Sequence, residues 1–139
     1  MLDDSEYSRW ISTARRAIDS AYGDLDRGDY NWACFKAQQA AEFAVKALLY
    51  GTGSPAYGHS ITRLLTNVKS MGVSISDEIV EYAKTLDKYY VPTRYPNAWA
   101  EGMPHEYYTN LDATNAIMYS ERIISWVEGI WIYLRRGEG

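Results

Sequence analysis

The sequence has little of the chemistry on which many protein classes depend. Of its 139 residues, one is a cysteine, two are histidines and four are prolines. The single Cys34 excludes an internal disulfide and a cysteine-based zinc site, and it fits a reducing compartment. No run approaches the ~18 apolar residues of a membrane span, and the acidic N-terminus lacks the basic region of a signal peptide. We therefore expect a soluble cytoplasmic protein, with Cys34 packed as a small hydrophobe.

The charge of the chain is nearly balanced. Lys and Arg number 14 and Asp and Glu number 18, which gives a net charge of −4. Binding of duplex DNA depends mainly on neutralising phosphates, so this balance argues against a duplex-DNA-binding protein. Hydrophobic residues make up 47% of the chain, which is enough for one packed domain. We expect a single domain over residues 1–139.

Aromatic residues are plentiful, but phenylalanine is scarce among them. Thirteen Tyr and five Trp accompany only two Phe. Tyr and Trp combine a large apolar face with a polar tip, and they are favoured where a surface meets a partner. We expect the part of this surface that a small core cannot bury to form a self-complementary patch, and hence a homodimer.

Apolar residues recur at helical spacing over most of the chain. The pattern predicts five helices, over residues 4–27, 30–50, 59–70, 76–90 and 109–136. Gly28 ends the first helix and Asp29 can cap the second, so these two helices are antiparallel neighbours. The predicted fold is all-α: an antiparallel up-and-down bundle of four main helices plus one short helix.

The predicted second helix has two distinct faces. One face carries a stripe of alanines that includes Ala41 and Ala44, and small side chains let a neighbouring helix approach closely. Gln38, Glu42 and Lys46 lie four residues apart on the opposite face. We expect Glu42 and Lys46 to form an exposed ion pair worth about 0.2–0.5 kcal/mol. The alternative is that Lys46 contacts a bound nucleotide.

Residues 91–108 form the least regular segment. They hold three of the four prolines and four aromatic residues. A loop of this length in a compact domain is usually functional or disordered, and the aromatic content favours order. Tyr90, Tyr95 and Trp99 are candidates to stack on a nucleobase. The alternative is that they form a packed lid or a dimer contact.

Arg94 lies between Pro92 and Pro96 in this segment. Its forked donors can hold a phosphate. It can equally pair with a carboxylate such as Asp87 or Glu101 and thereby hold the loop. The sequence alone leaves both interpretations open.

Catalytic constellations are scarce. The two histidines are His59 and His105, and neither has the preceding glutamate that a carboxylate-bridged di-iron bundle requires. We expect His59 to begin the third helix and to hydrogen-bond locally, because no acid or nucleophile partner is evident for it. A role at a ligand site is the alternative. No metal or other cofactor is expected.

Several short motifs, taken in order along the chain, resemble the prokaryotic HEPN domain family. Residues 38–49 (QQAAEFAVKALL) resemble its second helix, and residues 58–61 (GHSI) match the segment that follows. Residues 86–96 (LDKYYVPTRYP) resemble its tyrosine-rich helix end and Arg-Tyr-Pro turn. Asp112-Ala113, at the start of the final helix, also fits.

The resemblance implies a function as well as a fold. HEPN domains are antiparallel helical bundles that commonly dimerise, and many are encoded beside a minimal nucleotidyltransferase, with which they can form toxin–antitoxin modules. It implies a non-catalytic, dimeric binding module whose partner is a minimal nucleotidyltransferase and whose cleft accepts a nucleotide. The candidate ligand-binding residues are Lys46, His59, Tyr90, Arg94, Tyr95 and Trp99.

The alternative function is a metal-independent ribonuclease toxin. One branch of the family cleaves RNA with an arginine and a histidine, and four to six residues lie between the two. In this chain ten residues lie between Arg94 and His105. The family mechanism pairs these two groups from both subunits at the dimer cleft, so the spacing is a physical constraint. The departure favours the non-catalytic interpretation, and Arg94 with His105 is the catalytic pair of the alternative.

Overall fold

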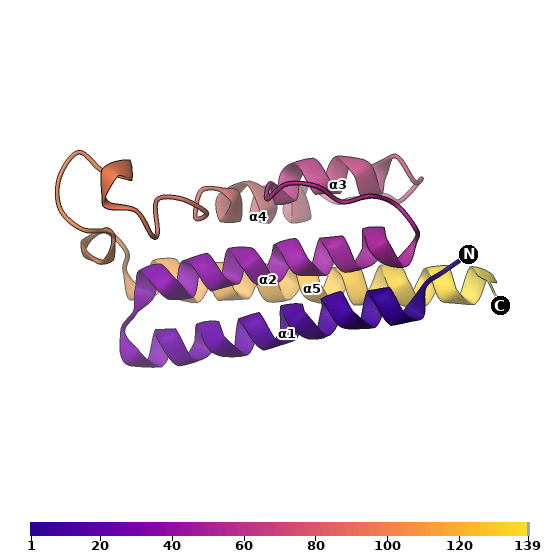
Figure 1. Cartoon of the computed structure of the whole chain (residues 1–139), viewed down its shortest axis with the longest axis horizontal. Coiled ribbons are helices and arrows are strands. Elements are labelled where there is room, and N and C mark those ends of the chain that lie inside the picture. The colour runs from indigo at the N-terminus through magenta and orange to yellow at the C-terminus, as the bar shows by residue number, and fades with distance from the viewer. Residues whose placement is uncertain (139) are drawn as a thin grey trace.

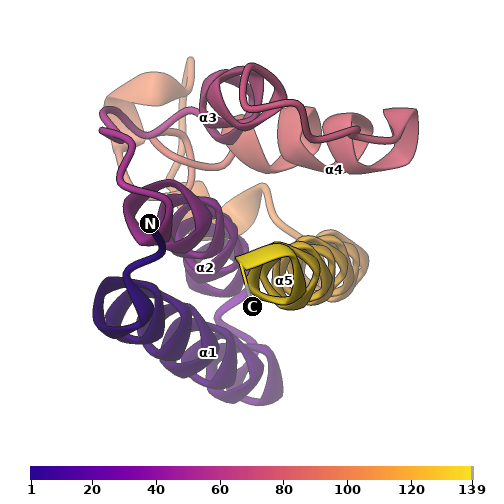
Figure 2. The same cartoon turned by 90° about the vertical axis from the view of Figure 1, so that its right-hand side faces the viewer.

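Three long helices form the main layer of the fold, which the computed structural model describes over residues 1–138. They are α1 (Asp4–Arg27), α2 (Tyr30–Gly51) and α5 (Asn110–Glu138). Two shorter helices, α3 (Ile61–Lys69) and α4 (Asp77–Asp87), lie against α2 and α5 respectively (Figures 1 and 2). The predicted all-α bundle is confirmed. Gly139, the last residue of the predicted domain, lies outside the described residues.

The chain runs up and down along one axis. In Figure 1, α1 runs from right to left, α2 runs back, and α5 runs in the same direction as α2. After α2, the short helices α3 and α4 form an antiparallel pair, because Asp87 at the end of α4 bonds to the start of α3. Both are shorter than the sequence predicts, and α4 ends at Asp87 rather than at Tyr90. The reason is that the N–H groups of Lys88 and Tyr89 bond to carbonyls three residues earlier, which tightens the chain into turns.

The helix ends follow local sequence signals. Gly28 ends α1 with a φ of 81°, a left-handed conformation that glycine adopts without steric cost. Ser60 and Ser76 cap α3 and α4 by accepting a backbone N–H of the first turn. Thr109 and Asp112 form the predicted capping box, with reciprocal hydrogen bonds of 3.0 and 3.1 Å.

Small side chains at the centre of α2 set the spacing of the core. Ala41 and Ala44 are fully buried, as predicted. Cys34 is also fully buried and packs as a small hydrophobe. Burial, and to a lesser degree the charge of Asp112, raises the pKa of the Cys34 thiol to about 12. Within residues 1–138, no helix has the length and apolar character that crossing a membrane requires.

The three long helices also meet at one end of the bundle through an aromatic pair. Tyr7 of α1 stacks on Trp131 of α5, with ring centroids 4.1 Å apart. Gly51, at the end of α2, lies directly against this pair, since a Cβ at that position would come within 2.7 Å of the Trp131 ring. The absence of a side chain at Gly51 therefore lets α2 approach both of its neighbours.

The second face of α2 is buried, and the prediction of an exposed Glu42–Lys46 pair is wrong. Gln38 is 0%, Glu42 2% and Lys46 9% exposed. The pair itself forms, at 3.0 Å between Lys46 Nζ and Glu42 Oε2. The burial arises because α1 and α5 pack on one side of α2 while α3, α4 and the loop before α3 cover another (Figure 2). A helix at the centre of a bundle has no wide solvent-facing side.

Candidate functional site

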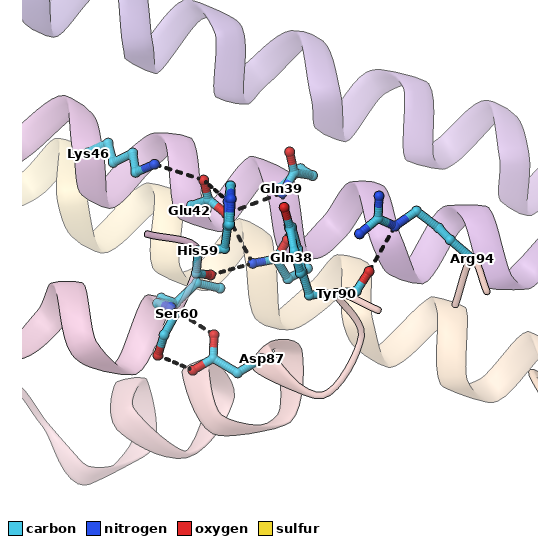
Figure 3. A network of polar contacts seen from close by, with 10 residues as sticks. Gln38, Gln39, Glu42, Lys46, His59, Ser60, Asp87, Tyr90 and Arg94 are labelled. Atoms are coloured by element: carbon cyan, nitrogen blue, oxygen red, sulfur yellow. Dashed lines mark hydrogen bonds and ion pairs between the residues drawn. The ribbon is translucent and has the colours of Figure 1, made fainter. Parts of the chain in front are cut away.

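A buried carboxylate organises a polar network on α2 (Figure 3). Glu42 accepts hydrogen bonds from Lys46 Nζ at 3.0 Å, from Gln39 Nε2 at 3.2 Å and from Gln38 Nε2 at 3.3 Å. The Nδ1 atom of His59 lies 3.3 Å from each of its oxygens. A carboxylate offers only acceptor atoms. The contact with His59 therefore places a proton on Nδ1.

His59 joins this network from the loop between α2 and α3. Gln38 Nε2 donates to the carbonyl of His59 at 2.9 Å, and the imidazole stacks on Tyr90 with centroids 4.4 Å apart. Two expectations for this residue are wrong: His59 lies before α3, which begins only at Ile61, and it does have an acid partner, Glu42. The His59 side chain stays 54% exposed. Its Nε2 has no hydrogen-bond partner within residues 1–138.

Arg94 lies on the other side of Tyr90, in an aromatic cradle formed by Phe35, Tyr90 and Tyr95 (Figure 3 shows Tyr90 between His59 and Arg94). The guanidinium carbon is 4.1, 4.7 and 5.0 Å from the three ring centroids, in that order. Its Nε donates to the Tyr90 carbonyl at 2.8 Å. These contacts use the flat faces and one N–H of the guanidinium. The two terminal nitrogens make no hydrogen bond or ion pair within residues 1–138.

The two carboxylates that could have held Arg94 do not pair with it within residues 1–138. Asp87 accepts two backbone N–H groups at the start of α3, at 2.7 and 3.1 Å, and the hydroxyl of Ser60 at 3.2 Å. It therefore fastens the start of α3 to the end of α4. Glu101 lies in an exposed turn, where its carbonyl accepts from the Tyr107 hydroxyl. The loop-holding alternative through these two carboxylates is wrong.

Trp99 belongs to a packed lid, formed by Trp99, Tyr107 and Tyr108. Its ring stacks on Tyr107 at 4.0 Å and meets Tyr108 edge-on at 5.8 Å. The indole Nε1 donates to the carbonyl of Pro92 at 2.7 Å. The segment is thus ordered by its own aromatic residues, as predicted. Trp99 makes no ring contact with the aromatic cradle in the described part of the chain.

His105 is separate from Arg94. It lies in the short 3-10 helix η2 (Pro104–Glu106) and is exposed. No hydrogen bond, ion pair or ring contact in the described chain joins these two residues. Nor do three or more His, Cys, Asp or Glu side chains of the described residues come together as metal ligands would. Of the candidate residues, the structure brings together Lys46, His59, Tyr90, Arg94 and Tyr95.

An open pocket of about 380 Å³ lies beside this group. It is lined by His59 and Tyr90, and by Lys88, Val91 and Pro92 from the chain after α4. Its volume is within the lower range of small-ligand sites. Lys88 adds an exposed cation at its edge. The pocket therefore combines aromatic faces with one exposed cation, and the carboxylate of Asp87 lines it as well.

These features define an all-α bundle that gathers cationic and aromatic side chains around one buried carboxylate of its central helix. The chain belongs to the HEPN domain family, whose model matches residues 7–130.

Several solved structures are similar to this chain. TT1696 from Thermus thermophilus is 45% identical, with a TM-score of 0.86 over 88% of this chain and 96% of that one. ST0689, an archaeal HEPN homologue, is 41% identical, with a TM-score of 0.75 over 88% and 95% of the two chains. A HEPN domain protein (tm0613) from Thermotoga maritima is 34% identical, with a TM-score of 0.73 over 88% and 97%. No curated protein matches the sequence.

Proposed function

We propose that this HEPN protein is a dimeric, non-catalytic module that binds a nucleotide, and that its partner is a minimal nucleotidyltransferase. The observation that carries the proposal is the state of Arg94. Its guanidinium is held by aromatic faces and one backbone carbonyl, and no carboxylate within residues 1–138 neutralises it. A cation held in this way is prepared for an anionic ligand.

The surroundings of Arg94 suit a nucleotide in particular. The terminal guanidinium nitrogens can take a phosphate in a forked geometry, and the exposed Tyr95 offers a face on which a base can stack. His59 and the small pocket continue this surface on the other side of Tyr90. A minimal nucleotidyltransferase is proposed as the partner because many HEPN proteins are paired with one.

The ribonuclease alternative has less support. Arg94 and His105 lie too far apart in sequence for the family's motif, and each is engaged in its own local structure. A nuclease would have to join them across two subunits. The experiment below therefore includes an RNA-cleavage arm.

Replacement of Arg94 by alanine tests the proposal. We expect R94A to stay folded, with a melting temperature close to that of the wild type, while its affinity for adenosine 5′-monophosphate falls by about 1.5–3 kcal/mol. Isothermal titration calorimetry measures the affinity, and differential scanning calorimetry measures the stability. R136A, in an exposed residue near the end of α5, is the matched control and keeps the wild-type affinity.

Two results would contradict the proposal. A lower melting temperature of R94A, with a loss of binding that merely follows it, would assign Arg94 to the structure alone. Cleavage of RNA by the wild type, abolished in both R94A and H105A, would establish the ribonuclease alternative.

A further inference from the structure

The contact between His59 and Glu42 has a chemical consequence beyond holding the loop. Glu42 is 2% exposed and already accepts hydrogen bonds from Lys46, Gln38 and Gln39. Its oxygens face Nδ1 of His59, so the proton of the neutral imidazole lies on Nδ1. The hydrogen bond made by one ring nitrogen decides the state of the other. In the neutral ring, Nε2 therefore presents a lone pair.

This lone pair is available to a ligand. The His59 side chain is 54% exposed, and no group within residues 1–138 bonds to Nε2. Stacking on Tyr90 holds the ring plane, and the bond from Gln38 to the His59 carbonyl holds the backbone. The acceptor is therefore fixed in position before any ligand arrives, which reduces the ordering cost of binding.

His59 and Arg94 both lie against the ring of Tyr90. Tyr90 lies between them, with its ring centroid 4.4 Å from the imidazole centroid and 4.7 Å from the guanidinium carbon. Since only one aromatic ring separates the two groups, one small ligand that follows the edge of Tyr90 reaches both. Such a ligand needs an anion for Arg94 and a hydrogen-bond donor for His59.

We infer that Glu42 is a positioning residue that holds His59 as a hydrogen-bond acceptor, and that the site takes a phosphate ester bearing a free hydroxyl. The inference rests on the proposed function and narrows it, because a phosphate ester without a donor group satisfies only Arg94. The hydroxyl of a ribose meets the requirement in a nucleotide. The same chemistry occurs in a free sugar phosphate, which the experiment distinguishes.

The experiment compares three ligands by isothermal titration calorimetry at pH 8. They are adenosine 5′-monophosphate, its 2′,3′-dideoxy analogue, and ribose 5-phosphate. We expect the wild type to bind adenosine 5′-monophosphate about threefold to tenfold more tightly than the dideoxy analogue, as one hydrogen bond would give. The base adds stacking, so ribose 5-phosphate should bind more weakly than adenosine 5′-monophosphate.

Two variants test which residues cause the preference for adenosine 5′-monophosphate over its dideoxy analogue. H59F keeps a ring against Tyr90 but removes the acceptor, so we expect equal affinity for the two adenosine ligands. E42Q keeps the size of the side chain, but its amide can donate to Nδ1, so the ring proton can move to Nε2 and the preference should again disappear. E81Q, in an exposed glutamate of α4, is the matched control and should keep it. E42Q is measured well below its melting temperature.

The outcomes separate the two proposals. If the wild type binds both adenosine ligands equally and R94A loses both, the assignment of His59 is overturned while nucleotide binding stands. A preference that survives in H59F also overturns the assignment. If ribose 5-phosphate binds as tightly as adenosine 5′-monophosphate, the hydroxyl is recognised but the ligand is a sugar phosphate. If none of the three binds, both proposals fail.

Discussion

The burial of the Glu42–Lys46 pair can be tested by removing one charge. In E42Q the side chain keeps its size, but the Lys46 ammonium loses its carboxylate. The two side chains are 2% and 11% exposed, and breaking a buried pair from one side costs about 3–5 kcal/mol. Because Lys46 retains some contact with water, we expect a loss near the lower end, about 3 kcal/mol. An exposed pair would lose only about 0.2–0.5 kcal/mol.

Urea unfolding followed by circular dichroism measures this change. The expected loss corresponds to a decrease in melting temperature on the order of 10 °C. The double variant E42Q/K46M removes the stranded ammonium and should recover at least about 1 kcal/mol. E81Q should stay within about 0.5 kcal/mol of the wild type. A loss below about 1 kcal/mol in E42Q would refute the reasoning, because it would mean that water solvates the pair.

Three further predictions concern the core and the assembly. A41L should lose about 1–3 kcal/mol on urea unfolding, because the added methylenes overpack a fully buried position; unchanged stability would place this face in solvent. Burial raises the pKa of Cys34 and of Tyr89 to about 12, from 9.0 and 10.0. The unfolded chain therefore releases these protons first, and the free energy of unfolding should fall as pH rises from about 9 towards 12. Titration of every tyrosine near pH 10 in the folded protein would contradict this. Light scattering at micromolar concentration should show a dimer, and a monomer would defeat the prediction.

Much of the fold could be predicted because its signals are local. Gly28 and the Thr109–Asp112 box mark helix ends through backbone chemistry that acts within one turn. The buried Ala41 and Ala44 follow from periodicity alone. The end of α4 was predicted three residues too late. Pro92 prevents a helix from continuing past it, but it does not require the helix to extend as far as the residues just before it.

The site could be predicted only in part, because its contacts join distant segments. Arg94, Tyr90 and Tyr95 are close in sequence and were found together. The contact between His59 and Glu42 crosses from one element to another, and no periodicity reports it. One signal was present: α2 has few charged residues in its 22 positions, which is typical of a helix covered on most sides.

The bonds of Asp87 to the start of α3 also bear on how the molecule opens. Helices α3 and α4 are 9 and 11 residues long, shorter than the ~12–15 residues that an isolated helix needs. Since Asp87 closes residues 61–87 into one loop, the two helices should detach together as a single cooperative unit, and their amide hydrogens should exchange together. His59 and Tyr90 lie just outside the two ends of this unit. A ligand that bridges His59 and Arg94 would hold the unit closed. Slower amide hydrogen exchange across residues 61–87 would therefore report that the site is occupied, although those residues barely touch it.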